Sequence, residues 1–158
     1  MRHAMAASLA ILICAVPVKG LRADWEYAKW GMTPEQVAAG SRGAVTVIPI
    51  AKRKRLDEIK LENAAEGTYT DGPLNLRVSF SFSTERGGLA MVGYGVLDQA
   101  QNGLLKDWLI RKYGQPQSSG GLPIIGLETF HWGSPDEIDL SISKGDSAFV
   151  MHSPVSKN

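Results

Sequence analysis

His131, Asp139 and His152 are the side chains of this sequence best suited to acid–base chemistry. A histidine exchanges a proton near neutral pH, and a carboxylate beside it can hold the imidazole in one orientation. Because neighbouring residues of a strand point to opposite faces, alternation predicts that all three lie on the sheet face that carries no helices. If they converge there, a small hydrolase or isomerase using His131 and Asp139 is the alternative to a binding protein.

The sequence contains no complete motif for a metal site, a cofactor site or a catalytic nucleophile. The histidines lack the His-x-x-x-His and His-Glu-x-x-His spacings of zinc sites, and no Gly-x-Ser-x-Gly elbow occurs. The triplet Gly145-Asp146-Ser147 is typical of a turn. Gly93-Tyr94-Gly95 lacks the third glycine of a dinucleotide-binding loop. We therefore assign no catalytic residue, no metal and no cofactor from the sequence.

The first 23 residues have the pattern of a secretory signal peptide. Arg2 and His3 form a basic start, an apolar run follows, and Ala23 is a small residue at a usable cleavage site. Ile13 precedes Cys14 at the position where a lipoprotein signal has a small residue, which argues against lipidation. We expect the protein to be periplasmic or secreted, with cleavage of the signal or its retention as an anchor left open.

Removal of this segment changes both the charge and the cysteine content. Lys+Arg falls from 17 to 14 with the loss of Arg2, Lys19 and Arg22, while Asp+Glu stays at 16, so the net charge changes from +1 to −2. This balance disfavours a nucleic-acid partner held by general positive charge. Cys14 is the only cysteine, so residues 24–158 have none, which excludes disulfides and thiol catalysis there.

Two helices are predicted from their capping residues. Thr33 and Gln36, with a proline between them, form a capping box at the start of the first helix. A second box of Asp98 and Gln101 precedes an apolar stripe at helical spacing, which predicts a helix over residues 98–113. Each helix is followed by a group of segments with strand character.

Period-two alternation of apolar and polar residues marks the strands, most clearly over Asn75–Ser83. The predicted strands are residues 64–70, 75–83, 89–97, 128–132, 138–143 and 148–152. We therefore predict a single α+β domain, residues 24–158, with an antiparallel sheet of about six strands and two helices on one face. The order is a pseudo-repeat, α-βββ-α-βββ, with halves 24–97 and 98–158.

The segment Gly31-Met32-Thr33-Pro34-Glu35-Gln36-Val37 resembles the helix start of the SmpA/OmlA outer-membrane assembly lipoproteins. The order of helix and hairpin units is similar to that of the β-lactamase inhibitor proteins. These resemblances imply a small exported bacterial domain of tandem helix-plus-hairpin units. They supply no functional residue, because the chain lacks the lipobox of the first group and the disulfides of the second.

The sheet face without helices is the main candidate for binding. Short side chains leave such a face open, and Tyr and Arg are enriched at binding hot spots. The predicted members of this face are Arg77, Ser79, Ser81, Tyr94, His131, Asp139 and His152. We predict a non-catalytic periplasmic interaction or accessory protein that binds a protein or cell-envelope partner through this face.

Two further segments are candidate contacts. The basic run Lys52, Arg53, Lys54 and Arg55 suits an anionic partner such as a lipid headgroup or an acidic protein. The apolar segment 122–125 is another candidate, although such segments commonly fold over the edge of a core. No transmembrane span is expected after signal removal, and the sequence makes no prediction about the oligomeric state.

Overall fold

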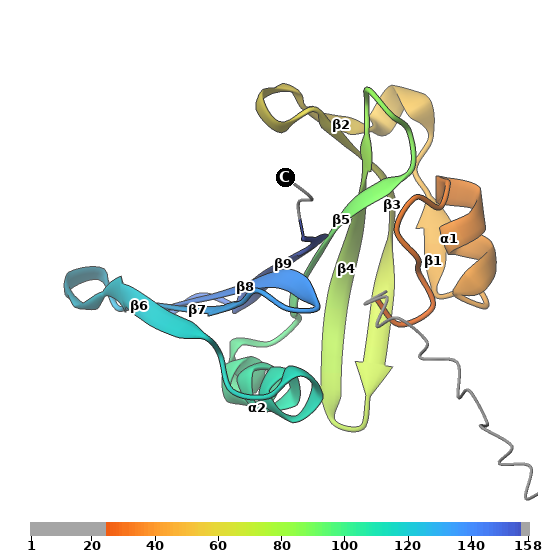
Figure 1. Cartoon of the computed structure of the whole chain (residues 1–158). Helices are drawn as coiled ribbons and strands as arrows, with labels where there is room; N and C mark the ends of the chain where they lie inside the picture. The colour runs from red at the N-terminus through yellow and green to blue at the C-terminus, as the bar shows by residue number, and fades with distance from the viewer. Residues whose placement is uncertain (1–24, 156–158) are drawn as a thin grey trace, which may run out of the picture.

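The computed structural model describes residues 25–155, which form one antiparallel sheet of nine strands with two α-helices (Figure 1). The predicted signal peptide, residues 1–23, lies outside the described residues. Neither helix within residues 25–155 is long and apolar enough to cross a membrane. The nine strands contradict the prediction of about six.

The elements follow the chain in a simple order. They are α1 (Pro34–Gly40), β1 (Val45–Val47), β2 (Lys54–Leu56), β3 (Leu61–Asp71), β4 (Leu74–Ser83), β5 (Leu89–Val96), α2 (Asn102–Tyr113), β6 (Ser118–Leu122), β7 (Leu127–Trp132), β8 (Asp136–Ser143) and β9 (Phe149–Pro154). The strand order across the sheet is β1-β3-β4-β5-β9-β8-β7-β6, and β2 also pairs with β3. The two halves of the chain therefore meet where β5 pairs with β9.

The three strands that raise the number from about six to nine are β1, β2 and β6. Residues 44–50 could form a strand by composition, but Pro49 indicates an edge strand or a loop. Strand β1 lies within them, at one edge of the sheet. Strands β1 and β2 have three residues each and lie on either side of a 3-10 turn that begins after Pro49. Strand β6 has the sequence Ser-Ser-Gly-Gly-Leu, which has low strand propensity and no apolar alternation. Pairing with longer neighbours stabilises these strands, so the predicted α-βββ-α-βββ order is wrong by two strands in the first half and one in the second.

Only one of the two predicted capping boxes forms. In α1 the backbone N–H of Gln36 donates to the Thr33 hydroxyl at 3.3 Å, and the Thr33 N–H donates to the Gln36 side chain at 2.9 Å. Asp98 instead caps a short 3-10 turn, so α2 starts later than predicted. The Gln101 side chain accepts the backbone N–H of Asn75 at 3.1 Å, which ties the start of α2 to β4.

A single buried cluster joins both halves of the sheet. In β4 the alternation predicts the buried face correctly, because Leu76, Val78 and Phe80 are all fully buried. Val37 of α1 belongs to the same cluster, as do Leu105, Trp108 and Leu109 of α2. Figure 1 shows the β6–β9 part of the sheet running across the β3–β5 part, with α2 beside the junction.

The segment before α1 completes this core. Trp25 is fully buried, and its ring lies 5.3 Å from that of Tyr69, 5.6 Å from that of Phe80 and 5.6 Å from that of Tyr94. Such aromatic pairs contribute about 0.5–1.5 kcal/mol each beyond their buried area. Trp25, the second residue after the predicted signal peptide, is therefore part of the folded domain.

Candidate functional site

The seven residues predicted for the open face are divided between the two faces of the sheet. Tyr94 and His152 are fully buried on the core side, so their predicted place on the open face is wrong. Tyr94 pairs with Val78 in β4, and His152 pairs with Val92 in β5, and both partners belong to the core. Neither side chain is accessible to a partner of the folded protein.

The misplacement of His152 has a specific cause. Alternation in β9 places His152 on the face opposite Phe149 and Met151, and these two large apolar side chains predict that theirs is the core face. These two apolar side chains are instead 45% and 46% exposed, because they lie on the open face. Strand β9 is apolar on both faces, so alternation alone cannot tell which face is buried.

The other predicted members point away from the core, but not all are accessible. Arg77 is exposed and Ser79 is partly exposed. Ser81 is only 1% exposed, and its hydroxyl donates to the Asn63 side chain. His131 and Asp139 are half-exposed.

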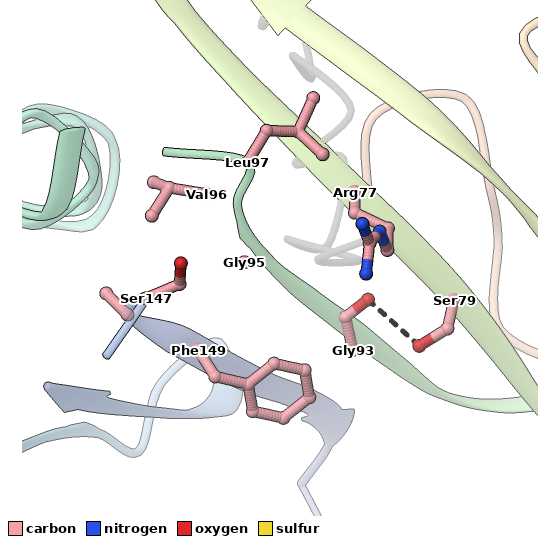
Figure 2. A pocket seen from close by; sticks show the side chains of 9 residues that line it. Arg77, Ser79, Gly93, Gly95, Val96, Leu97, Ser147 and Phe149 are labelled. Carbon is pink, nitrogen blue, oxygen red and sulfur yellow. Dashed lines mark hydrogen bonds between the residues drawn. The ribbon is translucent and has the colours of Figure 1, made fainter. Parts of the chain in front are cut away.

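A cavity of about 290 Å³ lies on the open face at the junction of the two halves (Figure 2). Strand register explains its position, because Arg77 pairs with Gly95 and Gly95 pairs with Phe149. The next row holds Ser79 and Gly93. The lining residues are Arg77, Ser79, Gly93, Gly95, Val96, Leu97, Ser147, Ala148 and Phe149.

The two glycines of β5 allow the Phe149 ring to lie across the strand. A Cβ atom at Gly93 would be 2.9 Å from the Phe149 ring and 2.9 Å from the Ser79 hydroxyl oxygen. A Cβ atom at Gly95 would be 2.7 Å from the Ala148 carbonyl oxygen. Aromatic rings commonly cover glycines on a neighbouring strand in this way. The result is a shallow cavity with an exposed ring on one side.

Arg77 supplies the charge of this cavity. Among residues 25–155, no carboxylate forms an ion pair with its guanidinium, whereas Arg53, Arg55 and Lys112 all have such partners. The Ser79 hydroxyl donates to the Gly93 carbonyl oxygen at 3.2 Å, as the dashed line in Figure 2 shows. The site therefore combines a cation, an exposed aromatic ring and hydroxyl groups, which suits an anionic group beside an apolar one.

His131 and Asp139 meet elsewhere on the open face. They are directly opposite in β7 and β8, and His131 Nδ1 lies 2.8 Å from Asp139 Oδ1. The pair borders a cavity of about 170 Å³ that also contains Ser118, Thr129 and Ser141. Within the described residues no hydroxyl group hydrogen-bonds to His131. Because His152 lies on the other face, the three residues singled out for acid–base chemistry do not converge.

His152 belongs to a buried polar cluster that the sequence did not reveal. Its Nε2 lies 2.9 Å from Asp136 Oδ2, and the Trp30 indole N–H donates to the same oxygen at 3.1 Å. Burial, assisted by the positive charge of Lys112, lowers the pKa of His152 to about 4. The Nδ1 atom is buried without a hydrogen bond, as expected for a neutral imidazole that donates through Nε2.

Asp136 was overlooked because Ser134-Pro135-Asp136 has the composition of a turn. In the structure Asp136 is the first residue of β8 and is 3% exposed. It links β9 to the segment before α1 through His152 and Trp30. Asp136 and His152 are closed to solvent, so the role of the cluster is to hold these segments together.

The basic run does not act as one patch. Arg53 donates to Glu62 at 3.1 Å and to the Ile48 carbonyl oxygen at 2.9 Å. Arg55 lies 3.4 Å from Asp57. The remaining two cations, Lys52 and Lys54, border a cavity of about 430 Å³ that also contains Glu66. Neighbouring carboxylates thus oppose much of the positive charge.

In the part of the chain that the structure describes, no three His, Cys, Asp or Glu side chains are placed to hold a metal ion together. No protein-family model, curated protein or solved structure matches this chain. The resemblance to SmpA/OmlA and β-lactamase inhibitor proteins therefore rests on short capping and turn motifs alone. A function has to follow from the surfaces of this chain itself.

Proposed function

We propose that this protein is an exported, non-catalytic binding module whose open sheet face holds a protein partner of the cell envelope. The contact centres on the cavity between Arg77 and Phe149. The observation that carries the proposal is the unpaired guanidinium of Arg77 beside an exposed ring that lies over two glycines.

The exposed apolar side chains of this face support binding. Leu97 is 50% exposed, Phe149 45% and Met151 46%, and the first two border the cavity that also contains Arg77. Single exposed apolar residues are common, but apolar side chains grouped around a cation are typical of interaction sites. Covering the three side chains would contribute hydrophobic free energy, at roughly 25 cal/mol for each Å² of apolar surface removed from water.

The chemistry of the cavity defines the part of the partner that enters it. A guanidinium pairs most strongly with a carboxylate, which can accept two parallel N–H bonds. The Phe149 ring offers an apolar surface next to that position. We therefore expect a carboxylate next to an apolar side chain, as found at a protein C-terminus or where Asp or Glu adjoins an aliphatic residue.

A binding experiment tests this with the protein as its host cell exports it. The envelope fraction is passed over immobilised wild type, Arg77→Ala and Arg86→Ala, the last being an exposed arginine in the β4–β5 turn that serves as the matched control. We expect Arg77→Ala to lose about tenfold or more of the captured partner while its thermal stability is unchanged, because charge-assisted contacts are worth about 1.5–3 kcal/mol. Equal capture by both variants would reject the site.

A small probe tests the carboxylate directly. N-acetyl-leucine carries a carboxylate beside an aliphatic side chain, and its amide has the same shape without the charge. In amide NMR spectra we expect the acid, and not its amide, to shift the signals of Gly93 and Gly95. Identical shifts with both compounds would mean that Arg77 does not select the charge.

A hydrolase or isomerase using His131 and Asp139 is the second candidate, favoured by their 2.8 Å contact. Such a pair could transfer a proton to or from a substrate. The measurement is hydrolysis of an activated ester by wild type and His131→Gln across the neutral pH range. Activity that is absent from both proteins supports the binding module, and activity lost only in the variant supports the enzyme.

Export itself is also a proposal, because it depends on residues 1–23. The sequence predicts cleavage after Ala23. N-terminal sequencing of protein from the periplasmic fraction is expected to begin at Asp24. Recovery of the uncut chain in the cytoplasm would refute export.

A further inference from the structure

The turn between β6 and β7 projects from the sheet and carries exposed aliphatic side chains. Leu122 is 59% exposed, Ile124 is fully exposed and Ile125 is 63% exposed. Figure 1 shows this hairpin extending away from the helices at the far end of the sheet. The segment therefore does not fold over the edge of the core, and it places three large apolar side chains together in water.

Two backbone hydrogen bonds fix the shape of this turn. Residues 123–125 form one 3-10 turn, in which the Gly126 N–H donates to the Pro123 carbonyl oxygen at 3.1 Å. The Lys144 N–H then donates to the Gly126 carbonyl oxygen at 3.0 Å. Because these bonds hold the turn in one shape, ordering its backbone on contact with another surface costs little further conformational entropy.

We propose that this hairpin tip, Leu122–Ile125, inserts into the apolar boundary of a lipid bilayer. The tip is convex, so it fits a fluid bilayer, whose lipids can rearrange around it. It contains no Trp, Tyr or Arg, the residues that dominate protein–protein hot spots, whereas leucine is under-represented there. Aliphatic side chains bind bilayers in proportion to the apolar area that they bury.

The charges at the base of the tip define the lipid. Lys144 contacts Gly126, since a Cβ atom built there would be 2.6 Å from the Lys144 Cβ. Glu128 pairs with Gly121 in the adjoining strands. One cation and one anion thus flank the tip, so binding to zwitterionic lipid should equal binding to anionic lipid. The Lys144 chain can extend its ammonium toward the headgroups.

This contact is separate from the proposed partner site and from the basic run. The tip begins at the last residue of β6, at one edge of the sheet, while Arg77 lies on β4. The basic run includes the first two residues of β2, which pairs with β3. A lipid-bound tip therefore leaves the Arg77 cavity accessible. Each of these three surfaces can be altered by mutation without changing the other two.

Co-flotation with vesicles of phosphatidylcholine tests the inference, using the protein as its host cell exports it. Wild type is compared with Ile124→Asp and with the matched control Ile50→Asp, since Ile50 is 80% exposed in the turn that follows β1. We expect Ile124→Asp to lower vesicle binding about tenfold or more, because it replaces buried hydrocarbon with charge at the interface. Ile50→Asp, Arg77→Ala and high salt should leave binding unchanged.

Three results would overturn the inference. The first is equal flotation of wild type and Ile124→Asp. The second is binding that requires phosphatidylglycerol and is lost on charge reversal of Lys52 and Lys54, which would assign the contact to the basic run. The third is a dimer or protein complex that Ile124→Asp disrupts while no protein floats with vesicles. Because Ile124 is fully exposed, its replacement should leave thermal stability unchanged, and this is measured alongside.

Discussion

Acidification should destabilise this protein through the burial of His152. Its pKa falls from an ordinary 6.5 to about 4 because the folded chain removes the imidazole from water and places Lys112 nearby. Between these two values the unfolded chain binds a proton that the folded chain excludes. Stability is therefore fully present above about pH 6.5 and falls as the pH decreases toward about 4.

The size of the effect follows from the two pKa values. Each unit of difference is worth about 1.36 kcal/mol, so the loss is about 1 kcal/mol at pH 6, about 2 at pH 5 and about 3 at pH 4. The groups that face the imidazole include Asp136 from β8, and Trp30, Tyr94 and Tyr113, whose rings lie 5.6–6.3 Å from it. Asp136 favours the protonated form, but protonation would also leave an Nδ1–H buried without an acceptor.

Urea unfolding at several pH values, followed by tryptophan fluorescence, measures this loss. Subtracting the profile of His152→Gln from that of wild type removes the contribution of the carboxylates, which also titrate at low pH. His131→Gln is the matched control, because it removes a half-exposed histidine of the open face and leaves His152 in place. A wild type that gains stability relative to His152→Gln as the pH falls below 6.5 would show that the ion pair with Asp136 outweighs burial, and would refute the reasoning.

The remaining predictions concern single backbone and side-chain contacts and use the same unfolding assay at neutral pH. Gly95→Ala should cost about 1–3 kcal/mol, because its Cβ would lie 2.7 Å from a backbone oxygen. Gly103→Ala, with no atom within 4 Å of the new Cβ, should instead stabilise α2 by about 0.5–1 kcal/mol. Trp30→Phe removes a hydrogen bond to buried Asp136 and should cost about 1–3 kcal/mol. Thr33→Ala removes the capping box of α1 and should lower the free energy of unfolding by about 1 kcal/mol. An unchanged free energy of unfolding in any one of these variants would contradict the reasoning given for that variant.

The sequence could predict the strands that are apolar on one face only. In β4, the alternation of Leu76, Val78 and Phe80 with polar residues identifies both the strand and its buried side. The capping box of α1 is equally local, since all its hydrogen bonds form between Thr33 and Gln36. These features depend on residues close together in the chain, so a single sequence contains the required information.

Features that depend on contact with another segment, and not on the propensity of the residues themselves, could not be predicted. Strand β6 exists because β7 pairs with it, although its Ser-Ser-Gly-Gly sequence has little strand propensity of its own. The cluster of Trp30, Asp136 and His152 joins three segments, and Trp30 and Asp136 are 106 residues apart. Strand β9 shows the same limit, because Phe149 and Met151 make its open face as apolar as the face that holds Val150, and only pairing with β5 decides which face is buried.

The triplet Gly93-Tyr94-Gly95 shows how one short segment serves both faces of the sheet. On the core side Tyr94 is fully buried and packs against Trp25, whereas on the open side the two glycines leave space that Phe149 partly covers. The cavity therefore lies where the two halves of the chain pair, and the same β5–β9 contact that closes the core also creates it. A change that weakens this pairing should alter stability and partner binding together, whereas Arg77→Ala should alter binding alone. That difference separates a true contact residue from one that only supports the fold.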